Sequence, residues 1–213
     1  MAGCCSPTDY RRLFSRKYAS RDAKRYRKRG LTGSSRALVA LAGDVRGASV
    51  LDVGGGIGAI ELELLAAGAD RATNVELSGG YEEAAAELLA ERGVEERVAR
   101  RIGDFVTEGN EVEPHDIVVM HRVICCYPDV DALVGTAGGH AKQRLLVTYP
   151  QERVWVRAGL RAINLWLRIS RCGFRSYAHP VARIVGAAEA EGLRLERRER
   201  HGLFWESAAF ARS

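Results

Sequence analysis

The chain has 213 residues, of which 46% are hydrophobic and 28% are charged, and its net charge is +5. This length and composition suit one large domain with a full hydrophobic core, and they exclude a disordered chain, a collagen-like repeat and a disulfide-stapled miniprotein. The apolar runs fall far short of the roughly 20 residues that span a bilayer. Basic residues interrupt the first 20 residues, which excludes the apolar core of a secretory signal. We therefore expect a cytoplasmic protein without a transmembrane segment.

From about residue 48 onward, short β-rich runs alternate with longer amphipathic stretches, which is typical of βαβ units around a mostly parallel sheet. The predicted strands cover residues 49–53, 71–76, 98–102, 116–120, 145–149, 193–197 and 203–211. The predicted helices cover residues 57–67, 80–92, 130–140, 151–175 and 180–191. The last two strands fit an antiparallel pair. The prediction is an α/β fold with a Rossmann-like, doubly wound, mostly parallel seven-stranded sheet and helices on both faces.

Two basic segments stand outside this alternation. Residues 11–30 hold ten Lys or Arg and one acid, so this predicted helix carries +9 and the rest of the chain −4. Residues 151–175 combine a helical apolar pattern with six arginines. We expect a basic helical lid at residues 1–44, followed by one domain at residues 45–213 with a helical insert at about 151–175.

A glycine turn follows the first predicted strand, in the run Val-Leu-Asp-Val-Gly-Gly-Gly-Ile-Gly at residues 50–58. Glycine allows the backbone to approach a ligand closely at such a turn. Asp52 ends this strand, Glu76 ends the next one 24 residues later, and Asp104 follows the third. A carboxylate can accept hydrogen bonds from both hydroxyls of a ribose. Three acids at the carboxyl ends of successive strands therefore predict a crevice for a nucleoside.

The turn resembles the first motif of class I S-adenosylmethionine (SAM)-dependent methyltransferases, an acid followed by x-Gly-x-Gly-x-Gly. Asp52, Gly54, Gly56 and Gly58 match that motif. The order of predicted elements agrees with the family from about residue 45 to the end of the chain. A dinucleotide-binding fold is the competing interpretation, but it prefers Gly-x-Gly-x-x-Gly, and Ala59 stands at its last position.

The resemblance implies SAM as cofactor and S-adenosylhomocysteine (SAH) as product. It places the glycine turn against the methionine part of the cofactor, Glu76 on the ribose and Asp104 on the adenine amine. The cofactor-binding residues that we expect are Asp52, Gly54, Gly55, Gly56, Gly58, Glu76, Leu77, Asp104, Phe105, His121 and Arg27.

The methyl acceptor is expected at residues 121–128, the loop after the fourth predicted strand. This loop lacks the Asp/Asn-Pro-Pro-Tyr/Phe and Pro-Cys signatures that resemble amino-methylating and cytosine-5 enzymes. His121 is the candidate general base or acceptor-orienting group, because imidazole titrates near neutral pH; a satisfied polar residue is the other interpretation. Tyr127 is the second catalytic candidate. The expected substrate contacts are Cys125, Tyr127, His179 and Trp155.

Residues 120–129, together with the two basic helices, look similar to bacterial small-molecule methyltransferases grouped with magnesium-protoporphyrin O-methyltransferases. This similarity implies O-methylation of a small, anionic or aromatic molecule. A tetrapyrrole carries propionates and a flat apolar face, which Trp155, Trp166 and the arginines of the insert could bind. Many other anionic aromatic acceptors would fit as well.

The basic helix at residues 11–30 has three interpretations. As a lid, it would cover the crevice with Phe14, Tyr18 and Tyr26, and Arg25, Arg27 or Arg29 would hold a carboxylate. As an arm of an RNA methyltransferase, its cations would neutralise phosphates. It could also be a plain solvated helix. We favour the lid, so a nucleic-acid partner is possible but not expected.

Five cysteines, four of them in the adjacent pairs Cys4-Cys5 and Cys125-Cys126, do not form an extracellular disulfide framework. Thiolates in the acceptor loop could bind a soft metalloid as the methyl acceptor. The pairs lack the spacing of zinc sites, so small buried thiols are the expected outcome and no metal site is predicted. A module that binds SAM without chemistry is a further alternative.

Overall fold

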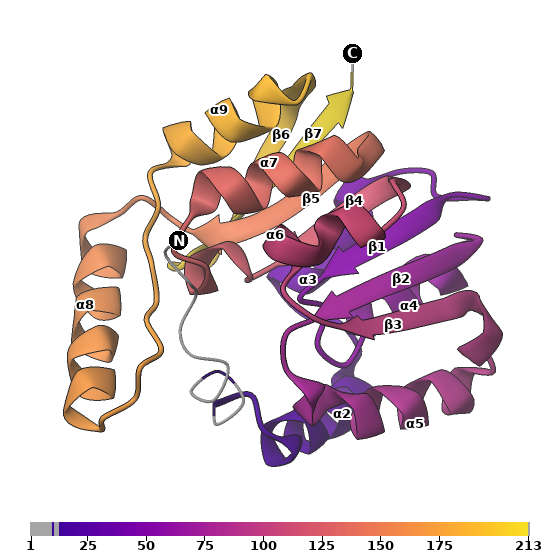
Figure 1. The fold of residues 1–213 in the computed structure, drawn as a ribbon, viewed down its shortest axis with the longest axis horizontal. Helices are drawn as coiled ribbons and strands as arrows, with labels where there is room; N and C mark the ends of the chain where they lie inside the picture. The colour runs from indigo at the N-terminus through magenta and orange to yellow at the C-terminus, as the bar shows by residue number, and fades with distance from the viewer. Residues whose placement is uncertain (1–9, 11–12, 213) are drawn as a thin grey trace.

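The computed structural model describes Tyr10 and residues 13–212. Its seven-stranded sheet has the order β3-β2-β1-β4-β5-β7-β6 (Figure 1). Strands β1 to β5 run parallel, whereas β7 is antiparallel to both β5 and β6. The strands are β1 Ser49–Val53, β2 Arg71–Glu76, β3 Val98–Ile102, β4 His115–His121, β5 Ala141–Pro150, β6 Leu193–His201 and β7 Trp205–Arg212.

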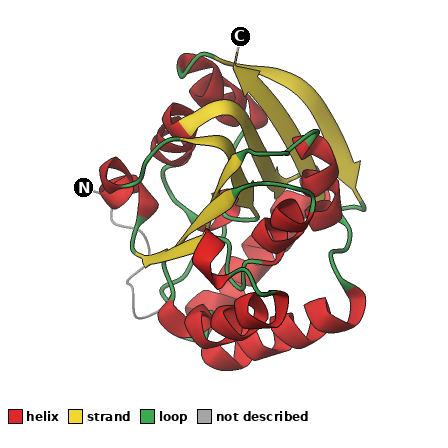
Figure 2. Cartoon of the chain, turned by 90° about the vertical axis from the view of Figure 1, so that its right-hand side faces the viewer, coloured by secondary structure: helices red, strands yellow, loops and turns green. Residues whose placement is uncertain are grey.

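Helices cover both faces of the sheet (Figures 1 and 2). The bounds of the helices are α2 Arg16–Arg29, α3 Ser34–Ala42, α4 Ala59–Ala66, α5 Glu82–Arg92, α6 Phe105–Glu108, α7 Val130–His140, α8 Val154–Ile169 and α9 Val181–Ala190. Four short 3-10 turns join them: η1 Gly79–Tyr81, η2 Glu95–Arg97, η3 Gly109–Glu111 and η4 Ile124–Cys126. The predicted Rossmann-like, doubly wound, mostly parallel sheet is confirmed, including the antiparallel closing pair.

The core lies on both sides of the central strands. All five residues of β1 are buried, because parallel strands with helices on both faces cannot alternate between core and water. On one face, α7 and α9 pack apolar side chains such as Leu133 and Ile184 against β4 and β5. On the other face, α3 and α4 contribute Leu38 and Leu64 to a second cluster. The carboxyl ends of β1, β2 and β4 therefore meet at one fixed edge.

Several element bounds differ from the prediction for local reasons. Gly58 adopts φ +77 before α4, so this helix begins at Ala59 and the glycine turn stays outside it. The insert helix α8 ends at Ile169 instead of 175, and Arg171 there has φ +55. The N-terminal basic helix ends at Arg29, and a separate helix α3 follows that the sequence did not reveal. Gly30 and Gly33, with φ of +61 and +52, separate the two helices.

The N-terminal helix α2 packs against α4 and α5. Its buried residues include Ala19, Ala23 and Tyr26. The Tyr26 hydroxyl donates to Glu63 of α4 at 2.6 Å. The segment after α8 meets α2's N-terminal end, where the rings of Phe174 and Phe14 lie 5.8 Å apart. Within the described part of the chain, every helix is too short or too polar to cross a membrane.

Candidate cofactor and acceptor site

Two cavities lie at the carboxyl ends of the parallel strands. The larger one, about 460 Å³, extends from Asp52 and the glycine turn to α2 and His121. The smaller one, about 40 Å³, lies between Leu77, Asp104 and Phe105. Gly54, Val123 and Cys126 line both cavities, so the two adjoin, and together we call them the crevice. Its position matches the predicted crevice beyond β1, β2 and β3.

The glycine turn forms the floor of this crevice. Gly54 has φ +65, and a Cβ at this position would lie 2.6 Å from Cγ2 of Val123. Gly56 has φ +58, and its N–H donates to the Glu76 carboxylate at 3.1 Å. Any larger residue at Gly54 would collide with the acceptor loop or require a strained backbone. The turn therefore brings bare backbone to the crevice, as the motif predicts.

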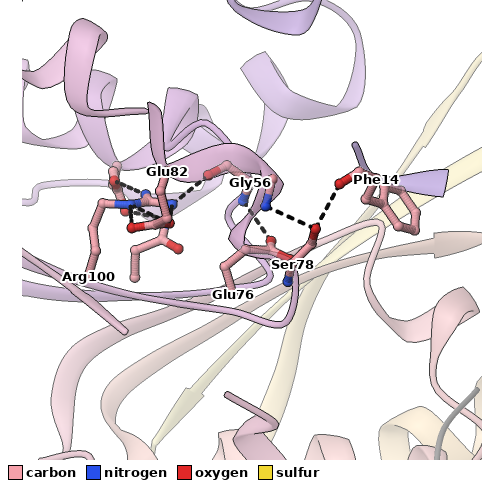
Figure 3. Close-up of polar contacts among 9 residues, drawn as sticks. Phe14, Gly56, Glu76, Ser78, Glu82 and Arg100 are labelled. Atoms are coloured by element: carbon pink, nitrogen blue, oxygen red, sulfur yellow. Dashed lines mark hydrogen bonds and ion pairs between the residues drawn. The ribbon is translucent and has the colours of Figure 1, made fainter. Parts of the chain in front are cut away.

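Arg100 of β3 holds the turn from one side, through the Gly56 carbonyl (Figure 3). Its guanidinium donates to the Gly56 carbonyl at 2.9 Å, pairs with Glu82 at 2.8 Å and lies 3.5 Å from Glu61. The Arg100 side chain is only 9% exposed. The motifs of the sequence do not point to Arg100; its one sequence signal is an arginine within a short β-rich run.

Glu76 lies at the rim of the larger cavity and is buried. Its carboxylate accepts hydrogen bonds from the N–H groups of Gly56 and Ser78. Burial raises the pKa of Glu76, although these two N–H donors and Arg100 act in the opposite direction. The two backbone donors thus fix the carboxylate beside the larger cavity.

Asp104 begins α6 and lines the smaller cavity. Its Oδ1 caps the helix by accepting from the N–H of Val106 at 3.0 Å. The Tyr127 hydroxyl lies 3.3 Å from both Asp104 oxygens. Leu77 and Phe105 line the same cavity. This apolar slot with one carboxylate has the character expected for an adenine ring.

Asp52 is the most unusual acid of the site. It is buried and lines the larger cavity. Among the described residues, neither of its carboxylate oxygens has a hydrogen-bond partner. Burial and the nearby Glu61 carboxylate raise the pKa of Asp52 well above its ordinary value, against the attraction of Arg100. A buried carboxylate without a partner is costly, so a cationic group of a ligand would stabilise it.

His121 ends β4 and lines the larger cavity. Its Nε2 lies 3.0 Å from the Ser34 hydroxyl of α3. Burial, together with the charges of Arg122 and His201, lowers the pKa of His121 to about 3. The imidazole is therefore neutral at physiological pH, and it can orient a group in the cavity by hydrogen bonding.

Arg122, which the sequence analysis did not single out, lines the same end of the cavity. Its φ of +61 is rare for a residue with a side chain. The guanidinium lies 4.6 Å from the Trp205 ring centroid and donates to the Ser34 hydroxyl at 3.2 Å. Arg25 lies on the same cavity and pairs with Asp22 at 2.6 Å. This end of the crevice thus carries two guanidinium groups and one carboxylate.

Two predicted acceptor contacts, Tyr127 and Cys125, do not line the larger cavity. Tyr127 lines the smaller cavity beside Asp104 and is absent from the lining of the larger cavity, where His121 lies. Cys125 is buried, and its thiol donates to the carbonyl of Arg122 at 3.4 Å. Cys126 lines both cavities instead. The phase of the 3-10 turn decides which of two adjacent cysteines faces the crevice, and the sequence does not specify it.

Three further predicted contacts lie outside both cavities. His179 supports the acceptor loop, because its Nε2 lies 2.9 Å from the Tyr127 carbonyl. Trp155 is 54% exposed on α8, and its indole donates to the Leu203 carbonyl at 3.1 Å. Arg27 pairs with Glu87 and Glu91 of α5 at 2.9 and 2.6 Å. These acids hold Arg27 on α5, whereas Arg25, two residues earlier, lines the larger cavity.

Of the two adjacent cysteine pairs, Cys125-Cys126 lies within the described residues. Cys4 and Cys5 lie outside the described residues. The sulfur atoms of Cys125 and Cys126 lie 3.7 Å apart, which is too far for a disulfide bond. Within the described ranges, no group of three or more His, Cys, Asp or Glu side chains is arranged to hold a metal ion.

No protein-family model and no curated protein matches the sequence. Solved structures do match it. Magnesium protoporphyrin IX methyltransferase ChlM from Synechocystis PCC 6803, solved with bound SAH, is 21% identical with a TM-score of 0.68; the match covers 84% of this chain and 82% of that chain. An O-methyltransferase family protein from Burkholderia thailandensis is 16% identical with a TM-score of 0.72, over 93% of this chain and 59% of that chain.

The chain has the class I methyltransferase fold. A further match is the cyclase SpnF, which is 16% identical with a TM-score of 0.63 over 84% of this chain and 81% of that chain. Because a protein named as a cyclase shares the fold, the fold alone does not determine the reaction. The residues of the crevice do.

Proposed function

We propose that this chain is a SAM-dependent methyltransferase that transfers the methyl group to an oxygen of a small, anionic or aromatic molecule. The observation that carries the proposal is the buried Asp52 carboxylate on the crevice floor, which has no hydrogen-bond partner among the described residues. Asp52 would pair with the cofactor's cationic methionine end. Glu76 and Asp104 follow at the next two strand ends, as a nucleoside requires.

Each part of the cofactor has a matching group in the crevice. Glu76, held by two backbone N–H groups, would accept the ribose hydroxyls. Asp104 would accept from the adenine amine, with Leu77 and Phe105 against the ring. The bound cofactor supplies a methyl group that is already activated on a sulfonium. The protein's main tasks are therefore to align the acceptor and to exclude water.

The acceptor is proposed to lie between the glycine turn and α2, where the charged groups favour an anion. Arg25 and Arg122 line this end of the larger cavity. Burial lowers the pKa of Arg122, because it disfavours the charged guanidinium. An acceptor carboxylate beside Arg122 would stabilise that positive charge. The rings of Tyr18 and Phe14 line the same space and suit an aromatic acceptor. His121 would orient the acceptor oxygen by hydrogen bonding.

The first experiment measures cofactor binding by titration calorimetry with SAM and SAH. We expect Glu76→Gln to weaken binding about 10- to 100-fold, because a hydrogen bond to a charged group is worth about 1.5–3 kcal/mol. Glu83→Gln, an exposed acid on α5 that pairs with Arg16 at 3.5 Å, is the matched control and should leave binding unchanged. Equal affinity of wild type and Glu76→Gln would contradict the assigned ribose site.

The second experiment follows labelled methyl from SAM into a cell extract that is separated into RNA, protein and small molecules. Label in the small-molecule fraction is the expected result. Label in RNA would overturn the acceptor class and favour α2 as a docking arm. Cofactor binding without transfer to any fraction would contradict the activity and indicate a binding module.

A further inference from the structure

Helix α8 has two apolar faces, of which only one is packed. Val156, Leu160 and Leu167 are buried on the inner face. A second set of apolar side chains is 54–82% exposed: Val154, Trp155, Leu165, Trp166 and Ile169. At 100° per residue these five fall within an arc of about 120°, opposite the packed face. The helix stands at one edge of the molecule, apart from the sheet (Figure 1).

The exposed stripe continues beyond the helix. Leu203, in the turn between β6 and β7, is 78% exposed. Its carbonyl accepts the hydrogen bond from the Trp155 indole, so the turn adjoins the N-terminal end of the stripe. We call the five exposed α8 residues and Leu203 the apolar patch. Large contiguous apolar surfaces of this kind mark interaction sites.

A row of arginines borders the apolar patch. Arg157, Arg161 and Arg168 are exposed and fall on one side of α8, at about 200–240° when Trp155 is set at 0°. The chain from residue 153 to residue 175 holds six arginines and no acid. Of the arginines in the row, Arg157 has an ion pair, with Glu152 at 3.2 Å. The surface beside the patch is therefore strongly positive.

The apolar patch and the arginine row together favour one kind of binding partner over the others. A second copy of the chain would bring two arginine rows together, with no acid on either helix to offset them. A nucleic acid would bind the arginines and leave leucine, isoleucine and tryptophan in water. An anionic lipid surface satisfies both, because the apolar side chains enter the acyl boundary while the guanidinium groups meet phosphates. Tryptophan is favoured at that interface.

We propose that α8 and the adjoining β6–β7 turn bind the surface of an anionic lipid bilayer. The helix has 16 residues, or about 24 Å at 1.5 Å per residue, so it lies in the interface and does not cross the bilayer. The apolar patch gives the depth of insertion, and the arginine row gives the preference for negative headgroups.

The test is flotation of the full chain with vesicles, in the absence of cofactor and acceptor. Vesicles of phosphatidylcholine alone are compared with vesicles that contain about one third phosphatidylglycerol. We expect flotation with the anionic vesicles, little with the neutral ones, and a loss of binding as salt rises. Because no methyl transfer is measured, a negative result here leaves the proposed function untouched, and a failure of that function leaves this test valid.

Matched variants separate the two contributions. Leu165→Gln/Trp166→Gln/Ile169→Gln should reduce vesicle binding at least about 100-fold, whereas Ile102→Gln, which changes a 49% exposed residue on β3, should not. Arg157→Gln/Arg161→Gln/Arg168→Gln should also reduce binding about 100-fold. Lys24→Gln/Lys28→Gln/Arg29→Gln removes the same charge from exposed positions of α2 and should change binding less than about 3-fold.

Circular dichroism and thermal unfolding would check that each variant is folded. We expect folded variants because the substituted positions are exposed. Several results would overturn the proposal. Among them are no flotation with anionic vesicles at low salt, an equal loss in the α2 control, and a lipid-free dimer whose dissociation follows the α8 substitutions. Capture of RNA through α8 with no vesicle binding would equally overturn it.

Discussion

The floor and the roof of the crevice are built in different ways. The floor is backbone: the Gly56 N–H and the Ser78 N–H hold Glu76, and Arg100 holds the Gly56 carbonyl. The roof is side-chain packing, in which the rings of Tyr10, Phe14 and Phe174 lie 4.5–6.0 Å apart. Backbone geometry tolerates little change, whereas packed rings can separate and return. The floor therefore suits a constant cofactor, and the roof suits entry of an acceptor.

One hydrogen bond joins floor to roof. The Ser78 hydroxyl donates to the Phe14 carbonyl at 2.7 Å and accepts from the N–H of Gly80. Figure 3 shows this link on the opposite side of Gly56 from Arg100. Variants that change the floor alone or the roof alone test the difference between these two regions.

The largest effect is expected from Gly54→Ala on the floor. The added Cβ would lie 2.6 Å from Cγ2 of Val123, at a φ of +65. We expect SAM affinity to fall at least about 100-fold, and the free energy of unfolding to fall by about 1–3 kcal/mol. Titration calorimetry and urea unfolding measure the two. Gly79→Ala is the control, since a Cβ there meets no atom within 4 Å. A Gly54→Ala protein with normal SAM affinity would contradict a cofactor in close contact with the turn.

A smaller effect is expected from Asp52→Asn. The pKa of Asp52 is raised, so the folded protein without ligand holds this proton above the ordinary carboxyl pKa. A cationic ligand favours the ionised form, so SAM affinity should increase as pH rises through that raised pKa, with release of a proton. Asp52→Asn should remove this pH dependence and weaken SAM binding about 10-fold at high pH.

Calorimetry in two buffers of different ionisation enthalpy measures the released proton. The exposed Asp44, which pairs with Arg46, provides the control Asp44→Asn. Identical proton release in wild type and Asp52→Asn would assign the linkage to Glu61 or Glu76, whose pKa values are also raised by burial.

Gly80→Ala acts on the roof with the floor left in place. A Cβ at Gly80 would lie 2.6 Å from the Phe14 carbonyl oxygen and 3.2 Å from the Arg16 nitrogen. Both neighbours are backbone atoms, so the start of α2 must move. We expect SAH to dissociate several-fold faster, and unfolding to become easier by about 1 kcal/mol. Stopped-flow release of SAH measures the rate. If Gly80→Ala slowed release, the segment around Phe14 would not cover the cofactor.

Most of the floor was predictable because its signals are local. The strands β1, β2 and β3 coincide with the predicted residues, since each is a short β-rich run that ends at an acid or is followed by a glycine. The roof was predicted less well. Residue 174 is a phenylalanine whose role depends on contact with Phe14, 160 residues earlier in the chain. Arg122 and Cys126 face the crevice because of the backbone after β4, where Arg122 has φ +61. No periodic pattern predicts such a turn.

The smallest expected effect concerns the pH dependence of methyl transfer. The sequence predicts His121 as a base that titrates near neutral pH, but burial and the neighbouring Arg122 and His201 lower its pKa to about 3. A group with that pKa stays neutral from about pH 5 to pH 9. The kcat/KM profile should therefore have no limb from His121 in this range. His121→Gln, which keeps a hydrogen-bonding side chain, should lower kcat only about 3- to 10-fold.

The same measurement distinguishes positioning from proton transfer. The Ser34 hydroxyl contacts both His121 and Arg122, so Ser34→Ala should raise the acceptor KM and leave the shape of the pH profile unchanged. A limb near pH 6.5 that disappears in His121→Gln would show that the imidazole titrates in the working enzyme. Such a result would mean that closure of the roof over a bound acceptor raises the pKa of His121, because an anionic acceptor favours the imidazolium form. The acceptor end would then depend on the roof for its chemistry, while the cofactor end would not.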